Sequence, residues 1–294
     1  MCGLPAVAQR MAINARQAPR FERLVDVGGR RLYINCSGKA PKGIPVVVMD
    51  AGMGSTSNAW SLVQPKVAPF ARVCSYDRAG MGKSDRAPQR HTSQDIVNDL
   101  HHLLVKTGIK PPYVLVGHSL GGMNVRLYAS KYPKEVKGMV LVDSTHEDET
   151  DRMIALLPPQ MLQKAKPEDM LIQSPEDIDF NGSVAQVRAA NWHRDIPLIV
   201  ITRGNATFNP TDYVVPSLAP KFEEIRLELQ KDLVRRSSRG KQIIAEKSGH
   251  NIHRDQPELV INAIRQVVKE AFRASDAIPA QDDLSRTSRR TRRR

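Results

Sequence analysis

The 294-residue chain has few cysteines and no long apolar run. Its three cysteines, Cys2, Cys36 and Cys74, are too few for a disulfide framework, and none lies in a CxxC pair or among histidines. We therefore expect Cys74 to be a small core residue, no metal site, and a reducing, cytoplasmic location. No apolar stretch reaches the ~18 residues of a membrane-spanning helix, so we expect no transmembrane segment.

Six of the 13 net positive charges of the chain come from its C-terminal end. Residues 286–294 hold six arginines among serines and threonines, and such a segment cannot bury enough apolar surface to fold. We predict a disordered, solvated basic tail over residues 276–294, with binding to nucleic acid or an anionic surface as the alternative. Residues 1–20 form a polar leader that lacks the apolar centre of a secretory signal.

The order of apolar segments favours one α/β domain. A hairpin around Gly28-Gly29 precedes a regular alternation of apolar strands and amphipathic helices, which predicts a mostly parallel sheet with helices on both faces. The expected strands are 21–27, 31–36, 44–49, 72–76, 113–116, 138–142, 196–201 and 241–245. The expected helices are 57–70, 92–107, 123–132, 218–236 and 256–272.

The most informative motif is Gly117-His118-Ser119-Leu120-Gly121-Gly122, between an apolar strand and a helical stretch. A serine on such a sharp turn has its hydroxyl lifted clear of the sheet, and the glycines give the turn the room it needs. The amide of Leu120 then lies at a helix N-terminus, where unpaired N–H groups favour negative charge. This amide is therefore a candidate oxyanion donor.

This motif resembles the nucleophile elbow Gly-x-Ser-x-Gly of the α/β-hydrolase family, in its serine-nucleophile esterase and lipase branch. Residues 77–84 similarly match that family's Asp-x-x-Gly-x-Gly-x-Ser turn, which we interpret as structural. The resemblance covers roughly residues 20 to 275 and implies an α/β-hydrolase domain over 21–275. It also implies a helical lid insertion over 144–195. The apolar residues expected to line the lid are Leu156, Leu157, Met161, Met170, Leu171, Ile172 and Trp192.

A serine hydroxyl needs a base to act as a nucleophile at neutral pH. His250 follows the last strand and precedes the last helix, where the resembled family places its catalytic histidine. We expect the nearby His253 to face solvent at the start of the helix. We interpret His118, inside the elbow, as structural and expect strand alternation to point it away.

The histidine needs a carboxylate to fix its tautomer, and two candidates remain open. The commonest family position follows the strand 196–201, where no acid occurs before Asp212. Asp143 ends the preceding strand, a place that some family members use, and we favour it. The family usually shows His-Gly in the loop after strand 44–49, whereas this chain has Ala51-Gly52, so the second oxyanion amide is expected at Met53.

These residues predict a serine hydrolase that cleaves small-molecule carboxylic esters through an acyl-enzyme, with Ser119, His250 and Asp143 as catalytic triad. No GxGxxG or P-loop spacing is present, and the chemistry needs no cofactor. The same triad also serves an acyltransferase, lactonase, amidase or C–C hydrolase, which remain alternatives. A hydrolase-fold binding module without catalysis is the alternative from another class. An aspartate nucleophile, as in haloalkane dehalogenases, is excluded because the elbow holds Ser119.

Overall fold

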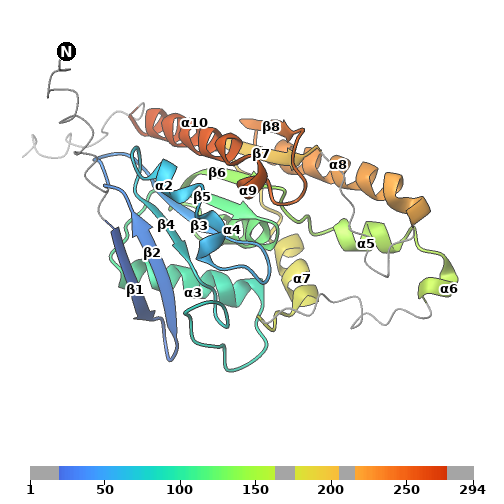
Figure 1. The fold of residues 1–294 in the computed structure, drawn as a ribbon, viewed down its shortest axis with the longest axis horizontal. Coiled ribbons are helices and arrows are strands. Elements are labelled where there is room, and N and C mark those ends of the chain that lie inside the picture. The colour runs from blue at the N-terminus through green and yellow to red at the C-terminus, as the bar shows by residue number, and fades with distance from the viewer. Residues whose placement is uncertain (1–19, 163–175, 205–215, 277–294) are drawn as a thin grey trace, which may run out of the picture.

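The computed structural model describes residues 20–162, 176–204 and 216–276, which form one α/β unit around a single sheet (Figure 1). The eight strands of this described part lie in the order β1-β2-β4-β3-β5-β6-β7-β8. Their bounds are β1 Arg20–Asp26, β2 Arg31–Ser37, β3 Val46–Asp50, β4 Val73–Tyr76, β5 Tyr113–His118, β6 Val136–Val142, β7 Leu198–Arg203 and β8 Gly240–Ala245. The hairpin β1-β2 is antiparallel, and β3 to β8 run parallel. The predicted sheet is confirmed.

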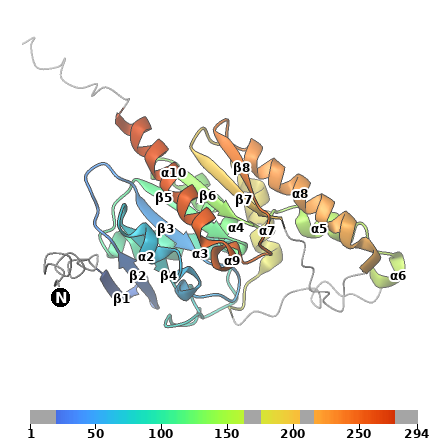
Figure 2. The same cartoon turned by 45° about the horizontal axis from the view of Figure 1, so that its top comes forward.

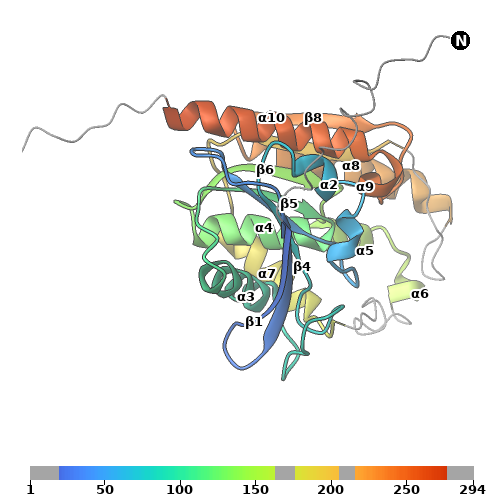
Figure 3. The ribbon, with the colours of Figure 1, turned by 60° about the vertical axis from the view of Figure 1, so that its left-hand side comes forward.

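Helices cover both faces of this sheet, as Figure 3 shows edge-on. The described helices are η1 Ser57–Trp60, α2 Gln64–Val67, α3 Ser93–Lys106, α4 Leu120–Lys131, α5 Glu149–Ile154, α6 Pro159–Leu162, α7 Phe180–Ala190, η2 Pro216–Leu218, α8 Ala219–Arg235, α9 Ile252–Asp255 and α10 Pro257–Asp276. Helices α3, α4 and α7 pack together under one face, and α2, α9 and α10 lie over the other. In Figure 2 α8 runs beside β7 and β8 at the far edge of the sheet.

The expected amphipathic faces lie in the core. In α3 the apolar side chains Ile96, Leu100, Leu103 and Leu104 are all buried, as the helical spacing requires. The helix begins at a capping box in which Thr92 and Asp95 satisfy each other's backbone amides. The predicted helix 57–70 is wrong in one respect: it is split into η1 and α2, because Pro65 lacks an N–H group and sits in the first turn of α2.

The segment 144–195 is described only in part, and Met170, Leu171 and Ile172 lie outside the described residues. Its helix α7 is not a separate cover, since Val184 and Val187 pack in the same core cluster as α3 and α4. Trp192 also packs in that core, in contrast to the expected pocket lining, whereas Met161 is exposed. The lid role of the segment stays a prediction.

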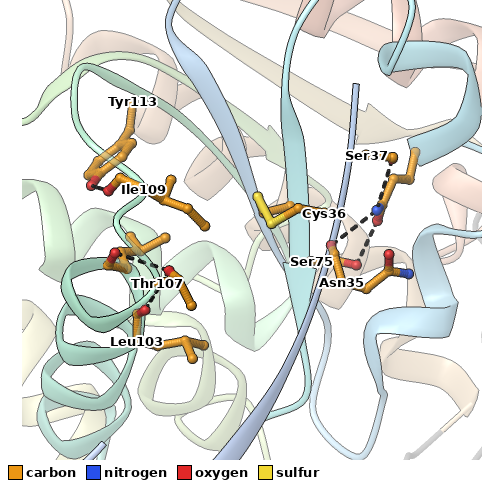
Figure 4. The surroundings of a disulfide bond; sticks show 11 residues. Asn35, Cys36, Ser37, Ser75, Leu103, Thr107, Ile109 and Tyr113 are labelled. Carbon is orange, nitrogen blue, oxygen red and sulfur yellow. Dashed lines mark hydrogen bonds between the residues drawn. A yellow bond between two sulfur atoms is a disulfide. The ribbon is translucent and has the colours of Figure 1, made fainter. Parts of the chain in front are cut away.

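Cys36 and Cys74 form a disulfide between β2 and β4, which corrects the expectation of free cysteines. The two residues are direct partners in the antiparallel pairing of these strands, and both are fully buried. Figure 4 shows the bond on the side of α3, while Asn35, Ser37 and Ser75 lie on the other side of the strands. Cys74 is a core residue, as expected, but as half of a cross-link. The expected cytoplasmic location rested on the absence of disulfides, so this bond removes the support for it.

None of the described helices has both the length and the apolar character that crossing a membrane requires.

Candidate active site

Ser119 occupies a strained turn between β5 and α4, as expected for a nucleophile elbow. Its φ of 53° and ψ of −122° are unusual for a residue with a side chain. A β-carbon on Gly117 would lie 2.4 Å from the carbonyl oxygen of Gly121, and one on Gly121 would lie 2.3 Å from that of Asp50. Both glycines are therefore required by close backbone packing around the elbow.

Asp143 and His250 are joined by a hydrogen bond of 2.7 Å from Nδ1 to Oδ2. Asp143 follows β6 with a φ of 39°, and His250 follows β8, so both lie beyond the carboxyl ends of parallel strands. The Asp143 side chain is 3% exposed, whereas that of His250 is 42% exposed. The carboxylate is thus buried behind an imidazole whose other side is open to a substrate.

Ser119 is tied to the strand end that carries Asp143. Its backbone N–H donates to the carbonyl of Val142 at 3.2 Å, and its carbonyl accepts from the N–H of Thr145 at 3.1 Å. Ser119 and Asp143 are therefore held in register by main-chain bonds on both sides of Asp143.

The loop after β3 lies against the elbow. A β-carbon on Gly52 would lie 3.4 Å from Cβ of Ser119 and 2.8 Å from Nδ1 of His118, so only glycine fits there. The next residue, Met53, is half-buried. Leu120 is the first residue of α4, so its amide is one of the N–H groups without an intrahelical acceptor. The two amides expected to form an oxyanion hole thus lie on the two segments that flank Ser119.

The match to known proteins agrees with this geometry. A model of the alpha/beta hydrolase fold matches residues 45–170, which include the elbow and Asp143. A Gibberella zeae protein named as an AB hydrolase superfamily protein is 24% identical over 278 residues, covering 76% of this chain and 86% of the relative. The chain has the α/β-hydrolase fold.

Further similarities extend over most of the hydrolase. YqjL of Bacillus subtilis is 29% identical over 224 residues, covering 75% of this chain and 82% of that protein. A thermophilic esterase from Thermogutta terrifontis superposes with a TM-score of 0.59 at 18% identity, covering 87% of this chain and 100% of the other. Such low identity shows a shared fold, and the family match together with these neighbours supports a hydrolase enzyme.

Two arginines that contact Asp143 were not anticipated from the sequence. Arg226 of α8 donates to Oδ1 of Asp143 at 3.1 Å, and Arg203 at the end of β7 donates to Oδ2 at 3.2 Å. Burial raises the pKa of Asp143, but the His250 hydrogen bond and the two guanidinium groups outweigh it and hold the pKa below its usual value. Arg203 is the last residue of β7, next to the position where the resembled family commonly has its acid. Nothing in the sequence marked Arg226.

His118 and His253 form a buried group of aromatic rings behind His250. The ring centroids of His118 lie 4.6 Å from His250 and 4.4 Å from His253, and His253 also lies 5.2 Å from Trp60. His118 Nε2 donates to the carbonyl of His250 at 2.9 Å, so it does not point away from the site but holds its backbone. The expectation that His253 faces solvent is wrong, since it is 1% exposed.

Burial also determines the charge of these two rings. It lowers the pKa of His118 well below its usual value and that of His253 to about 4. Both rings are therefore neutral at pH 7. Of these three neighbouring histidines, His250 is the one whose side chain is exposed, at 42%.

The remaining expectations concern Asp212 and metals. Asp212 lies outside the described residues, so Asp143 is the candidate acid that the structure describes. No group of three or more histidine, cysteine or acidic side chains that could hold a metal ion occurs in residues 20–162, 176–204 and 216–276.

Proposed function

We propose that this hydrolase cleaves carboxylic esters of small molecules with Ser119 as nucleophile, His250 as general base and Asp143 as the orienting acid. The observation that carries the proposal is the 2.7 Å hydrogen bond between His250 and Asp143 at the sheet edge where the elbow presents Ser119. An orienting acid and a base beyond parallel strands, next to a strained serine, are what nucleophilic acyl transfer requires.

In the proposed reaction, Ser119 Oγ attacks the ester carbonyl while Nε2 of His250 takes the hydroxyl proton. The carbonyl electrons move to oxygen, and the amides of Met53 and Leu120 donate hydrogen bonds to that oxyanion. When the oxyanion collapses, the ester C–O bond breaks and His250 gives its proton to the leaving alcohol. A water molecule then repeats the sequence on the acyl-enzyme and releases the carboxylic acid and Ser119.

Asp143 suits its part because it stays ionised. Arg203 and Arg226 together with His250 keep its pKa below the usual value, so the carboxylate is present whenever the imidazolium forms. The Nδ1 hydrogen bond then directs the free Nε2 of His250 toward the substrate side.

The first test is the substitution Ser119→Ala. We expect it to remove p-nitrophenyl ester hydrolysis and labelling by a fluorophosphonate probe, because the hydroxyl is the attacking group. Circular dichroism should be unchanged, since Ser119 is half-buried and its backbone supplies the contacts to Val142 and Thr145. Ser248→Ala is the matched control, because this buried hydroxyl bonds Asp255 and is assigned no role in the chemistry.

A variant without Ser119 Oγ that keeps more than a few per cent of wild-type turnover would contradict the proposal. The alternatives that use the same triad are separated by the products: an acyltransferase passes the acyl group to an added alcohol in preference to water. A lactonase, amidase or C–C hydrolase would be identified by higher kcat/KM on its own bond within one substrate panel.

A further inference from the structure

Arg78, in the turn after β4, is one of the most completely bonded side chains of the described residues. It is 2% exposed, and each of its five N–H donors has an acceptor between 2.5 and 2.9 Å. Two bonds go to the carboxylate of Glu176, one goes to Asp50, and two go to the main-chain carbonyls of Ala51 and Gly52. A buried guanidinium whose five N–H groups are all bonded restricts the positions of the carboxylates and carbonyls that accept from it.

The two carbonyls belong to the loop that carries the proposed oxyanion amide. Nη1 donates to the carbonyl of Ala51 and Nη2 to that of Gly52, each at 2.6 Å. In a trans peptide the carbonyl of one residue and the N–H of the next point in opposite directions. Because the Gly52 carbonyl is directed at Arg78, the N–H of Met53 is directed away from it. Gly52 itself lies against Ser119.

Glu176 completes the arrangement from a distant part of the chain. Its Oε2 accepts from the N–H of Gly54 at 2.7 Å as well as from Arg78 at 2.9 Å. One ion pair therefore holds the loop at three backbone groups, the carbonyls of Ala51 and Gly52 and the N–H of Gly54. Glu176, half of that pair, comes from the segment 144–195. Asp50 is bonded in turn by Tyr76 and Asn124, which fixes the end of β3 where the loop begins.

The positive charge of Arg78 stays in place over a wide pH range. Burial alone would lower the pKa of Arg78, but the carboxylates of Glu176 and Asp50 outweigh it and raise the pKa above its usual value. A lysine would keep the charge without the planar fork, so it cannot serve both carbonyls and both carboxylates at once.

We propose that Arg78 and Glu176 are positioning residues that set the orientation of the Gly52–Met53 peptide and thereby the oxyanion donor at Met53. The inference rests on the proposed function. It also explains why the turn 77–84 contains an arginine at position 78. Arg78 touches neither the substrate nor the reacting atoms; it acts through the loop.

The test compares Arg78→Lys and Glu176→Gln with Arg30→Lys in the full-length chain. Arg30 is a matched control, because its guanidinium makes a similar two-bond contact with Asp99 but touches no part of the loop. For Arg78→Lys we expect kcat to fall about 10²-fold with KM nearly unchanged, since the lost contact acts in the transition state. The inhibition constant of a trifluoromethyl ketone, whose adduct carries an oxyanion, should rise by a similar factor. Arg30→Lys should change neither value.

A second readout does not depend on substrate. Hydrogen–deuterium exchange of the peptide 50–56 should rise at least tenfold in Arg78→Lys, rise less in Glu176→Gln, and stay at the wild-type level in Arg30→Lys. Glu176→Gln keeps a hydrogen-bond acceptor for Gly54 and leaves the charges of Arg78 and Asp50 balanced, so it reports on the loop even if Arg78→Lys fails to fold.

The proposal is overturned if exchange in the loop is unchanged in both variants, or if kcat falls equally in Arg78→Lys and Arg30→Lys. A wild-type protein that does not react with a fluorophosphonate would instead contradict the proposed function. The exchange measurement would then still decide whether Arg78 and Glu176 order the loop.

Discussion

At the scale of single residues, Asp143 is the carboxylate that several basic side chains of the site contact. It accepts from His250, Arg203 and Arg226, yet it sits in a position with positive φ that a residue with a side chain seldom adopts. Such strain is retained where surrounding contacts outweigh it, and here the contacts are those with Arg203, Arg226 and His250.

The substitution Asp143→Asn should therefore reduce turnover much more than Asp212→Asn. An amide cannot stabilise the imidazolium of His250, and loss of the triad carboxylate costs about 10⁴-fold in kcat in a well-studied protease. Steady-state kinetics on the same ester decides between the two carboxylates. The reverse ranking would transfer the role of orienting acid to Asp212.

His253 gives a prediction about pH and stability. Its pKa is about 4 in the folded chain and near 6.5 in the unfolded chain, so between these values the unfolded state binds more protons. The free energy of unfolding should consequently fall as the pH drops from 7 to 4.5, by about 2–3 kcal/mol from this residue. His118, whose pKa is also lowered, acts in the same direction.

Urea unfolding of His253→Phe at both pH values measures that share. Phenylalanine fills the space beside Trp60 and takes up no proton, so the difference between pH 7 and 4.5 should shrink relative to the wild type. His102→Gln is the control at an exposed histidine and should leave the difference as it is. An unaltered difference in His253→Phe would show that this ring titrates at its ordinary value.

At the scale of elements, the sequence predicts what depends on local pattern. The hairpin, the alternation of strands and helices and the buried face of α3 follow from apolar spacing within one segment. The elbow is predictable for the same reason, because the glycines and Ser119 that form it are neighbours in the chain. A proline in a helical pattern shows where such predictions fail: Pro65 divides the stretch 57–70.

Contacts between distant elements could not be predicted in this way. Arg78 and Glu176 are 98 positions apart in the chain, and Arg226 and Asp143 are 83 apart, so no spacing rule relates them. The burial of His253 was not predicted, because Trp60 and His118, which cover it, come from two other segments of the chain. The proximity of Asp143 and His250, the proposed acid and base, was predictable because the carboxyl ends of parallel strands meet at one edge of the sheet.

At the scale of the whole molecule, the disulfide between Cys36 and Cys74 depends on the order of strands in the sheet. The chain passes from β2 to β3 to β4, but β2 pairs with β4. Strands that are consecutive in the chain are often neighbours in a sheet, which would pair β2 with β3. That pairing gives no reason to expect a bond between Cys36 and Cys74. The bond joins the antiparallel hairpin to the parallel part of the sheet and closes 38 residues of chain into a loop.

Closing a loop of this length lowers the entropy of the unfolded chain, which stabilises the folded state by about 3–4 kcal/mol in the chain-entropy model. Reduction should therefore lower the Tm by roughly 10 °C. The double variant Cys36→Ala/Cys74→Ala should melt at the lower temperature with or without reductant, and Cys2→Ser should behave as the wild type does.

Alkylation of the unfolded chain under air-oxidised conditions should modify one thiol before reduction and three after it. Three modified thiols without reductant, and a Tm insensitive to it, would mean that the two strands pair with free cysteines and would restore the case for a reducing compartment.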